Sequence, residues 1–127
     1  MDGHELIALC APRPVLVTVG SNTGPIGSNT QGDWWADPTC TFMAVTAAAP
    51  VYALLGEQAL VPAGQPPAIE NPPSKIQNVK MPPPETALTG GALAFRQHKG
   101  GHSDIPNWPA FLDLAARYFH SPVAKAK

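Results

Sequence analysis

The sequence is poor in charge and has no long apolar run. Charged residues make up 13 % of the 127 residues, about half the usual share, and the formal net charge is -1. A chain this close to neutral carries no basic footprint for nucleic acid or an anionic membrane, so neither is an expected partner. Its apolar runs stay well below the roughly 20 residues needed to span a bilayer. No membrane-spanning segment is therefore predicted.

Cysteine is scarce, and no metal-ligand pattern is visible. The two cysteines, Cys10 and Cys40, form neither a CxxC motif nor a cysteine–histidine spacing, which favours two buried free thiols. The four histidines show no convergent spacing either. We expect no metal and no cofactor. Residues 1–5 are polar and acidic, so no signal peptide is predicted within this chain.

Hydrophobic residues make up 44 % of the chain, which is enough for one globular domain with a core over residues 1–127. Eight of the sixteen prolines fall in residues 62–90, which predicts an extended surface loop there. Residues 121–127 are predicted to be a flexible tail. The predicted elements are a helix over 3–10, a buried strand over 15–20, a helix over 38–49 that Pro50 ends, a strand over 92–97, and an amphipathic helix over 106–120 with Phe111, Leu112, Ala115 and Phe119 on one side.

This order of elements predicts an α/β fold. Two continuously apolar strands joined through a helix indicate a parallel pair in a layered α/β architecture. Two strands cannot form a stable sheet alone. The chain is therefore expected to be one portion of a larger sheet, and incomplete as a domain.

Acidic and histidine side chains follow the two predicted strands. Asp33 and Asp37 come after the first strand, and His98 and His102 come after the second. Because sites in parallel sheets form at the carboxyl ends of strands, an acid and a histidine could meet there. Such a pair can act as a general base and the carboxylate that orients it. Taken alone, a histidine after a strand is more often a loop residue with a backbone hydrogen bond, and the two aspartates are equally plausible as turn or helix-cap residues.

Several blocks of the sequence together resemble a known family. They are residues 4–15 (HELIALCAPRPV), 33–38 (DWWADP), 49–56 (APVYALLG), 95–104 (FRQHKGGHSD) and 107–112 (NWPAFL). These blocks are similar, in the same order, to motifs of bacterial glucuronoyl esterases, which form carbohydrate esterase family 15 of the α/β-hydrolase superfamily. The similarity covers most of the chain outside the proline-rich segment and places it in the C-terminal part of such an enzyme.

The resemblance implies a serine-type carboxylic ester hydrolase acting on esters of glucuronic acid or its 4-O-methyl form, as found between xylan and lignin. By motif, His102 matches the catalytic histidine and Asp33 the catalytic acid. Asp37, or a glutamate upstream of this chain, is the alternative acid. His98 is expected to shape the turn around His102. Trp34 and Trp35 are candidate substrate-binding residues, because an indole can stack on a sugar, although either could instead anchor the core.

The sequence contains no G-x-S-x-G nucleophile motif. We therefore expect the serine and the oxyanion hole to come from the N-terminal remainder of the hydrolase domain, and this chain alone to be inactive. Two alternatives stay open. The whole protein could be another α/β-hydrolase, such as an acetyl xylan esterase or a peptidase-like enzyme, or the chain could be a short non-catalytic module that binds carbohydrate or protein. Members of the family are usually exported, which implies a secreted or periplasmic full-length protein.

Overall fold

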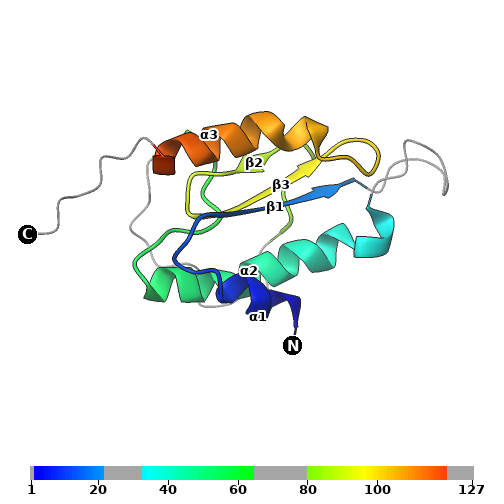
Figure 1. The fold of residues 1–127 in the computed structure, drawn as a ribbon. Helices are drawn as coiled ribbons and strands as arrows, with labels where there is room; N and C mark the ends of the chain where they lie inside the picture. The colour runs from blue at the N-terminus through cyan, green and yellow to red at the C-terminus, as the bar shows by residue number, and fades with distance from the viewer. Residues whose placement is uncertain (1, 22–32, 65–79, 120–127) are drawn as a thin grey trace, which may run out of the picture.

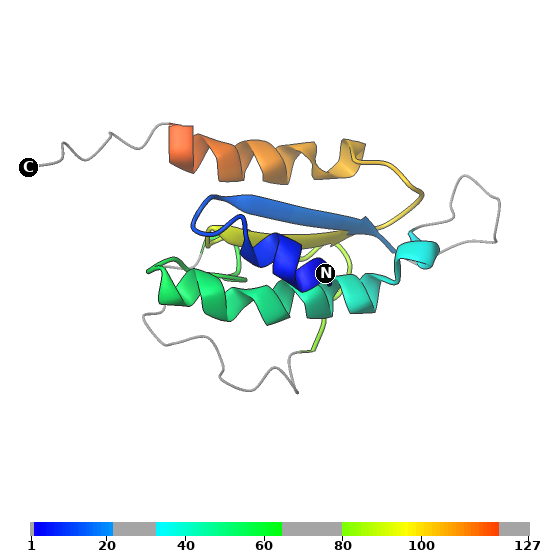
Figure 2. The ribbon, with the colours of Figure 1, turned by 60° about the horizontal axis from the view of Figure 1, so that its bottom comes forward.

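A computed structural model describes residues 2–21, 33–64 and 80–119 of the chain. These residues form three layers, with helices α1 and α2 on one face of a small sheet and α3 on the other (Figures 1 and 2). The elements in chain order are α1 (Gly3–Ala8), β1 (Val15–Gly20), the 3-10 turn η1 (Trp34–Ala36), α2 (Pro38–Leu54), β2 (Ala87–Leu88), β3 (Leu93–His98), the 3-10 turn η3 (Ile105–Asn107) and α3 (Trp108–Phe119).

The sheet has the strand order β1-β3-β2. Strands β1 and β3 are parallel, in a register that runs from Val15 opposite Leu93 to Gly20 opposite His98. The predicted parallel pair and the α/β fold class are therefore confirmed. Both strands end level with each other, so the segments that follow them leave the sheet at the same edge.

Strand β2 corrects one prediction. It lies inside residues 62–90, where a loop was expected throughout, and its two residues pair antiparallel with β3. Ala87 and Leu88 follow the last proline cluster and both have a backbone N–H, so they are able to pair with the neighbouring β3. Residues 65–79 of the proline-rich stretch and the predicted tail over 121–127 lie outside the described residues.

The core lies between α2 and the sheet. Phe42 packs against Phe95 with ring centroids 4.9 Å apart, and Tyr52 and Leu93 have no exposed surface. Burying one side chain of this size is worth about 1.5–3 kcal/mol. Val45 is a further fully buried member of this cluster. This core fastens α2 to the sheet and so sets where the segment before α2 reaches the end of β1.

Helix α2 runs through Pro50 to Leu54, so the prediction that Pro50 ends it was wrong. A proline inside a helix removes one hydrogen bond and costs about 3 kcal/mol. Here Pro50 is exposed, whereas Ala49 and Tyr52 are buried against the core. The apolar contacts on the sheet side offset the cost on the solvent side, and the helix continues.

Helix α3 forms where an amphipathic helix was predicted, but its apolar side is largely uncovered. Leu114 is its one buried residue among those described, while Phe111, Leu112 and Phe119 are exposed. The sequence pattern identified the helix and its apolar stripe correctly. It could not indicate how much of that stripe this chain covers by itself.

The cysteines are free thiols, but they are not buried as predicted. Cys10 is half-buried and Cys40 is exposed. Cys40 lies in the first turn of α2, where its backbone N–H is bonded to the Asp37 side chain 3.2 Å away. Its position at the solvent-facing start of the helix explains the exposure.

Candidate active site

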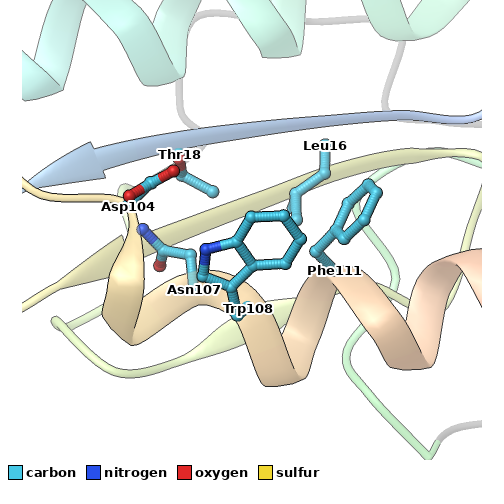
Figure 3. A pocket seen from close by; sticks show the side chains of 6 residues that line it. All are labelled: Leu16, Thr18, Asp104, Asn107, Trp108 and Phe111. Carbon is cyan, nitrogen blue, oxygen red and sulfur yellow. The ribbon is translucent and has the colours of Figure 1, made fainter.

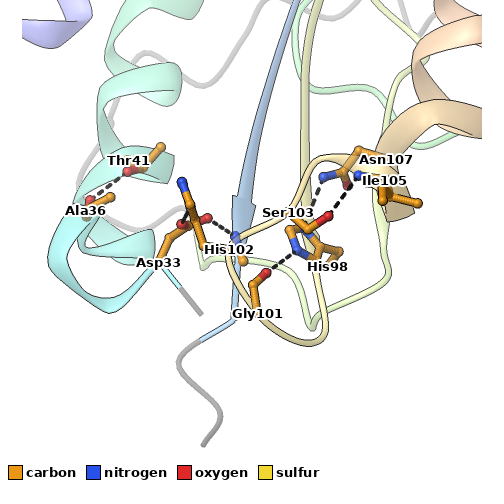
Figure 4. A network of polar contacts seen from close by, with 10 residues as sticks. Asp33, Ala36, Thr41, His98, Gly101, His102, Ser103, Ile105 and Asn107 are labelled. Carbon is orange, nitrogen blue, oxygen red and sulfur yellow. Dashed lines mark hydrogen bonds and ion pairs between the residues drawn. The ribbon is translucent and has the colours of Figure 1, made fainter. Parts of the chain in front are cut away.

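The candidate site forms beyond the adjacent ends of β1 and β3. Strand β1 ends at Gly20, and Asp33 returns to that end just before η1; β3 ends at His98, and the turn that follows carries His102. Figure 4 shows the two side chains facing each other across this edge. Asp33 and His102 are 69 residues apart in the chain, and they meet because the parallel register of β1 and β3 brings the two strand ends side by side.

Asp33 is a nearly buried carboxylate with both oxygens engaged. Its Oδ2 accepts a hydrogen bond of 2.5 Å from the backbone N–H of Gly20, and its Oδ1 is in hydrogen-bond contact with Nδ1 of His102. A Cβ atom at Gly20 would lie 3.2 Å from both Asp33 Oδ2 and the carbonyl oxygen of Gly101. The absence of a side chain at Gly20 therefore allows the acid and the histidine turn to approach the strand end together.

Among the described residues, the His102 ring contacts Asp33 and Trp35. Its side chain is 70 % exposed, against 12 % for Asp33. The Trp35 ring meets the His102 ring at a centroid distance of 4.8 Å and an interplanar angle of 62°. Within the described part of the chain, no hydrogen-bond partner lies at His102 Nε2. This arrangement places a proton on Nδ1, toward the carboxylate, and leaves Nε2 accessible as a base.

His98 occupies a different environment. It is 2 % exposed, and both ring nitrogens have partners: Nδ1 lies 3.0 Å from the Asn107 amide nitrogen, and Nε2 lies 3.1 Å from the carbonyl oxygen of Gly101. Figure 4 shows this ring between Gly101 and Asn107. Its place agrees with the prediction that His98 shapes the turn.

Asp37, the alternative acid within this chain, is the N-cap of α2. Its Oδ1 accepts hydrogen bonds from the backbone N–H groups of Thr39 at 3.1 Å and Cys40 at 3.2 Å. Hydrogen bonding from Cys40, first through its side chain and then through its backbone, lowers the pKa of the Asp37 carboxyl. The same contact raises the pKa of the Cys40 thiol. Asp37 therefore serves the helix start, and Asp33 is the acid that the structure brings to His102.

Of the two tryptophans predicted to bind substrate, the structure describes the side chain of Trp35 alone. Trp35 is 55 % exposed and lies against His102, whereas Trp34 begins η1 and its side chain is outside what the structure describes. A pocket of about 300 Å³ opens beside the Asp33–His102 pair, and the residues that line it are all of polar type: Thr18, Asp33, His98, His102, Ser103 and Asp104. Trp35 is therefore placed to meet a ligand that reaches His102.

A second, more apolar pocket of about 230 Å³ shares Thr18 and Asp104 with the first. It lies between β1 and α3, with Trp108 and Phe111 along its α3 side (Figure 3). Sequence reasoning missed Thr18, Asp104 and Asn107 as site residues. The last two fall inside the blocks that resemble the esterase motifs, which is the signal that could have identified them.

Among the described residues, no group of three or more His, Cys, Asp or Glu side chains is arranged to bind a metal ion. None of the described helices combines the length and apolarity needed to cross a membrane. What the described residues do form is a small mixed sheet between layers of helices, with an acid and a histidine in contact beyond the adjacent ends of its parallel pair of strands. These features define part of an α/β-hydrolase fold.

Comparison with known proteins shows which proteins the chain is similar to. No family model matches the chain. A curated relative, carbohydrate esterase MZ0003 from an unknown prokaryotic organism, is 48 % identical over 116 residues, which are 91 % of this chain and 21 % of that protein. Two solved structures are also similar, and the chain spans about a fifth of each of these three proteins.

The first structure is a CE15 glucuronoyl esterase from Teredinibacter turnerae T7901, with 39 % identity and a TM-score of 0.67 over 94 % of this chain and 22 % of the other. The second is a promiscuous CE15 esterase from the marine bacterial metagenome, with 28 % identity and a TM-score of 0.64 over 91 % of this chain and 22 % of the other. The resemblance predicted from the motifs is confirmed: the chain is similar to a segment of the esterases of carbohydrate esterase family 15.

Proposed function

We propose that this chain is the part of a serine-type carboxylic ester hydrolase that supplies the general base, His102, and its carboxylate partner, Asp33. The observation that carries the proposal is the contact between Asp33 Oδ1 and His102 Nδ1, with Nε2 left open beside a polar pocket. In this chemistry a neutral imidazole removes the serine proton through Nε2. The carboxylate holds the Nδ1–H and stabilises the imidazolium that forms.

The nucleophile and the oxyanion hole come from the N-terminal remainder of the hydrolase domain. The chain contains no G-x-S-x-G sequence, and triad residues act as a unit. The position of β1 supports a docked remainder, because within the described sheet β1 pairs with β3 alone and its other edge is unpaired. A further strand at that edge would satisfy the free backbone groups of β1 and lengthen the sheet.

The proposed substrate is a carbohydrate ester, in particular a glucuronate ester of the plant cell wall. The support is the similarity to a glucuronoyl esterase and to a carbohydrate esterase, together with the exposed indole of Trp35 beside His102. An indole face stacks well on a sugar ring. Because such esters occur in polymers outside the cell, the proposal includes a secreted or periplasmic full-length enzyme.

A hybrid enzyme tests the proposal. In this hybrid, the chain replaces the matching segment of carbohydrate esterase MZ0003. The hybrid keeps the upstream part of that protein. We expect the hybrid to hydrolyse a methyl ester of glucuronic acid, and the His102→Ala hybrid to lose on the order of 10⁴-fold or more in kcat. The isolated 127-residue chain should show no turnover. The matched control is His4→Ala, because His4 lies on α1 and is not among the residues that line the pocket, so its loss should leave the rate unchanged.

Two results would contradict the proposal. A folded hybrid that works equally well with alanine at position 102 would remove His102 from the mechanism. Turnover by the isolated chain that depends on His102 would show that the nucleophile is not upstream. A panel that adds acetylated xylan and a peptide ester to the glucuronate ester separates the proposed substrate class from other α/β-hydrolase activities.

A further inference from the structure

We propose that four residues, Glu85, Arg96, Asn107 and His98, form a hydrogen-bonded relay that positions the turn carrying His102. This inference rests on the proposed function, because it assigns these residues as positioning residues for the proposed base. The starting observation is the contrast between two neighbouring histidines. His98 is buried with both ring nitrogens bonded, whereas the His102 side chain is largely exposed and meets Asp33 and Trp35 on one side.

Arg96 determines which way the Asn107 side chain faces. A guanidinium has donors only, so the oxygen of the Asn107 amide must be the atom that faces it. The distance from Arg96 Nη1 to Asn107 Oδ1 is 2.5 Å, and the same nitrogen donates to the Pro106 carbonyl oxygen at 3.0 Å. The amide nitrogen of Asn107, which is also donor-only, is thereby directed at His98.

The orientation of Asn107 in turn determines the tautomer of His98. Asn107 Nδ2 lies 3.0 Å from His98 Nδ1, so Nδ1 accepts and the ring proton is on Nε2. That Nε2–H donates to the Gly101 carbonyl oxygen at 3.1 Å. Gly101 immediately precedes His102. The relay therefore ends on the peptide group that sets the direction in which His102 leaves the turn.

Glu85 attaches the start of the same turn. One of its carboxylate oxygens pairs with Arg96 Nη2, and the other accepts a hydrogen bond of 2.5 Å from the backbone N–H of Lys99. Glu85 has a φ of 72°, and its own N–H donates to the Gln97 carbonyl oxygen at 2.7 Å. The turn from Lys99 to Gly101, which includes Gly100 at a φ of 108°, is thus fastened at both ends by one connected network.

A turn of this kind needs such support. Its glycines provide little intrinsic stiffness, and the exposed His102 ring has few packing contacts of its own. A catalytic base displaced by about 1 Å can lose on the order of 100-fold in rate. The inner members of the relay, His98 and Asn107, are buried and hydrogen-bonded, so breaking the link between them leaves a buried polar group unsatisfied.

The experiment uses two substitutions of the same buried ring. His98→Gln keeps an amide donor near the Gly101 carbonyl oxygen, whereas His98→Leu removes it. In the 127-residue chain, proton NMR reports the downfield Nδ1–H signal of His102 in contact with Asp33, and nitrogen shifts of the imidazoles report the tautomers. We expect the His102 signal to broaden or vanish in His98→Leu and to persist in His98→Gln, with His98 as the Nε2–H tautomer in the wild type.

The hybrid enzyme supplies the kinetic readout. His98→Leu should lower kcat by about 10- to 100-fold with KM nearly unchanged, and His98→Gln should recover most of that loss. If His98→Leu does not fold, Arg96→Lys takes its place, since it keeps the charge beside Glu85 but cannot also hold Asn107; the same loss is expected. A folded variant with a wild-type His102 signal and wild-type kcat overturns the relay.

The two readouts also separate this inference from the proposed function. If the hybrid has no activity but His98→Leu removes the His102 signal in the chain, the relay stands and the esterase proposal fails. If the hybrid is active and neither His98→Leu nor Arg96→Lys changes kcat or the signal, the esterase proposal stands and the relay fails.

Discussion

Nδ1 of His102 and Oδ1 of Asp33 are in hydrogen-bond contact, although 69 residues separate them in the chain. The carboxylate is also bound on its other side, because Oδ2 accepts a hydrogen bond of 2.5 Å from the backbone N–H of Gly20. The acid is therefore nearly buried with a partner at each oxygen, whereas the histidine is exposed and contacts the acid through Nδ1. This division suits a base that must meet a group supplied from outside the chain.

Replacing Asp33 with asparagine should remove activity while keeping the fold. The oxygen of the introduced amide can still accept from Gly20, but its nitrogen would donate to His102 Nδ1 and move the ring proton to Nε2. A ring in that tautomer cannot accept the serine proton, so kcat of the hybrid should fall by on the order of 10⁴-fold. Asp33→Ala is the comparison variant, because it also leaves the buried Gly20 N–H unpaired. We expect it to lower the free energy of unfolding by about 1–3 kcal/mol relative to Asp33→Asn. Retained kcat in Asp33→Asn would point to an acid elsewhere.

Replacing Trp35 with alanine should affect substrate binding more than chemistry. The indole is 55 % exposed and meets the His102 ring in an edge-on contact. We expect the hybrid's KM for a glucuronate ester to rise several-fold, with kcat changed by less than about fivefold, as for a contact made equally in the ground and transition states. Trp35→Phe should retain much of the binding. A loss confined to kcat would instead assign Trp35 to positioning His102.

Two glycines provide a matched test of packing. A Cβ atom at Gly91 would fall against the backbone carbonyl of Gln58, whereas a Cβ at Gly3 meets nothing within 4 Å. We expect Gly91→Ala to lower the free energy of unfolding by about 1–3 kcal/mol through overpacking. Gly3→Ala should raise it by up to about 1 kcal/mol through helix propensity. Urea denaturation of the two variants checks the sign, and equal effects would contradict the described packing.

Tyr52 should make stability fall at alkaline pH. Burial, and then the charges of Cys10 and Tyr118, raise the pKa of Tyr52 to about 12 from its ordinary value of 10. Below pH 10 the phenol is neutral in both folded and unfolded chains, and its contribution is fully present. Between pH 10 and about 12 only the unfolded chain releases the proton, so stability is lost as pH rises.

Tyr52→Phe is the variant that isolates this effect. It removes the 3.1 Å hydrogen bond that the Tyr52 hydroxyl donates to the Arg13 carbonyl oxygen. We expect this loss to lower the free energy of unfolding by about 1 kcal/mol at neutral pH. Its unfolding free energy should then depend less on pH between 10 and 12 than that of the wild type. Denaturation series at fixed pH values measure both slopes, and parallel curves would exclude Tyr52 as the source.

Much of the fold was predictable because it depends on local pattern. The apolar runs before Gly20 and before His98 became the two parallel strands, and the three segments predicted as helices became α1, α2 and α3. Two of the errors have a common cause. Pro50 stays inside α2 and Leu88 pairs with β3 because contacts with distant residues outweigh the local preference of the chain.

For the candidate site, the sequence by itself determined the chemistry that is present: an acid and a histidine after successive strands, motifs similar to those of an esterase family, and no G-x-S-x-G nucleophile motif. Only the tertiary structure decided between residues of the same type. It brought Asp33 to His102 and used Asp37 as a helix cap, and it buried His98 while exposing His102. The physical reason is that these roles depend on strand register and on which backbone N–H groups lie within hydrogen-bond reach, and both are set by packing between residues far apart in the chain.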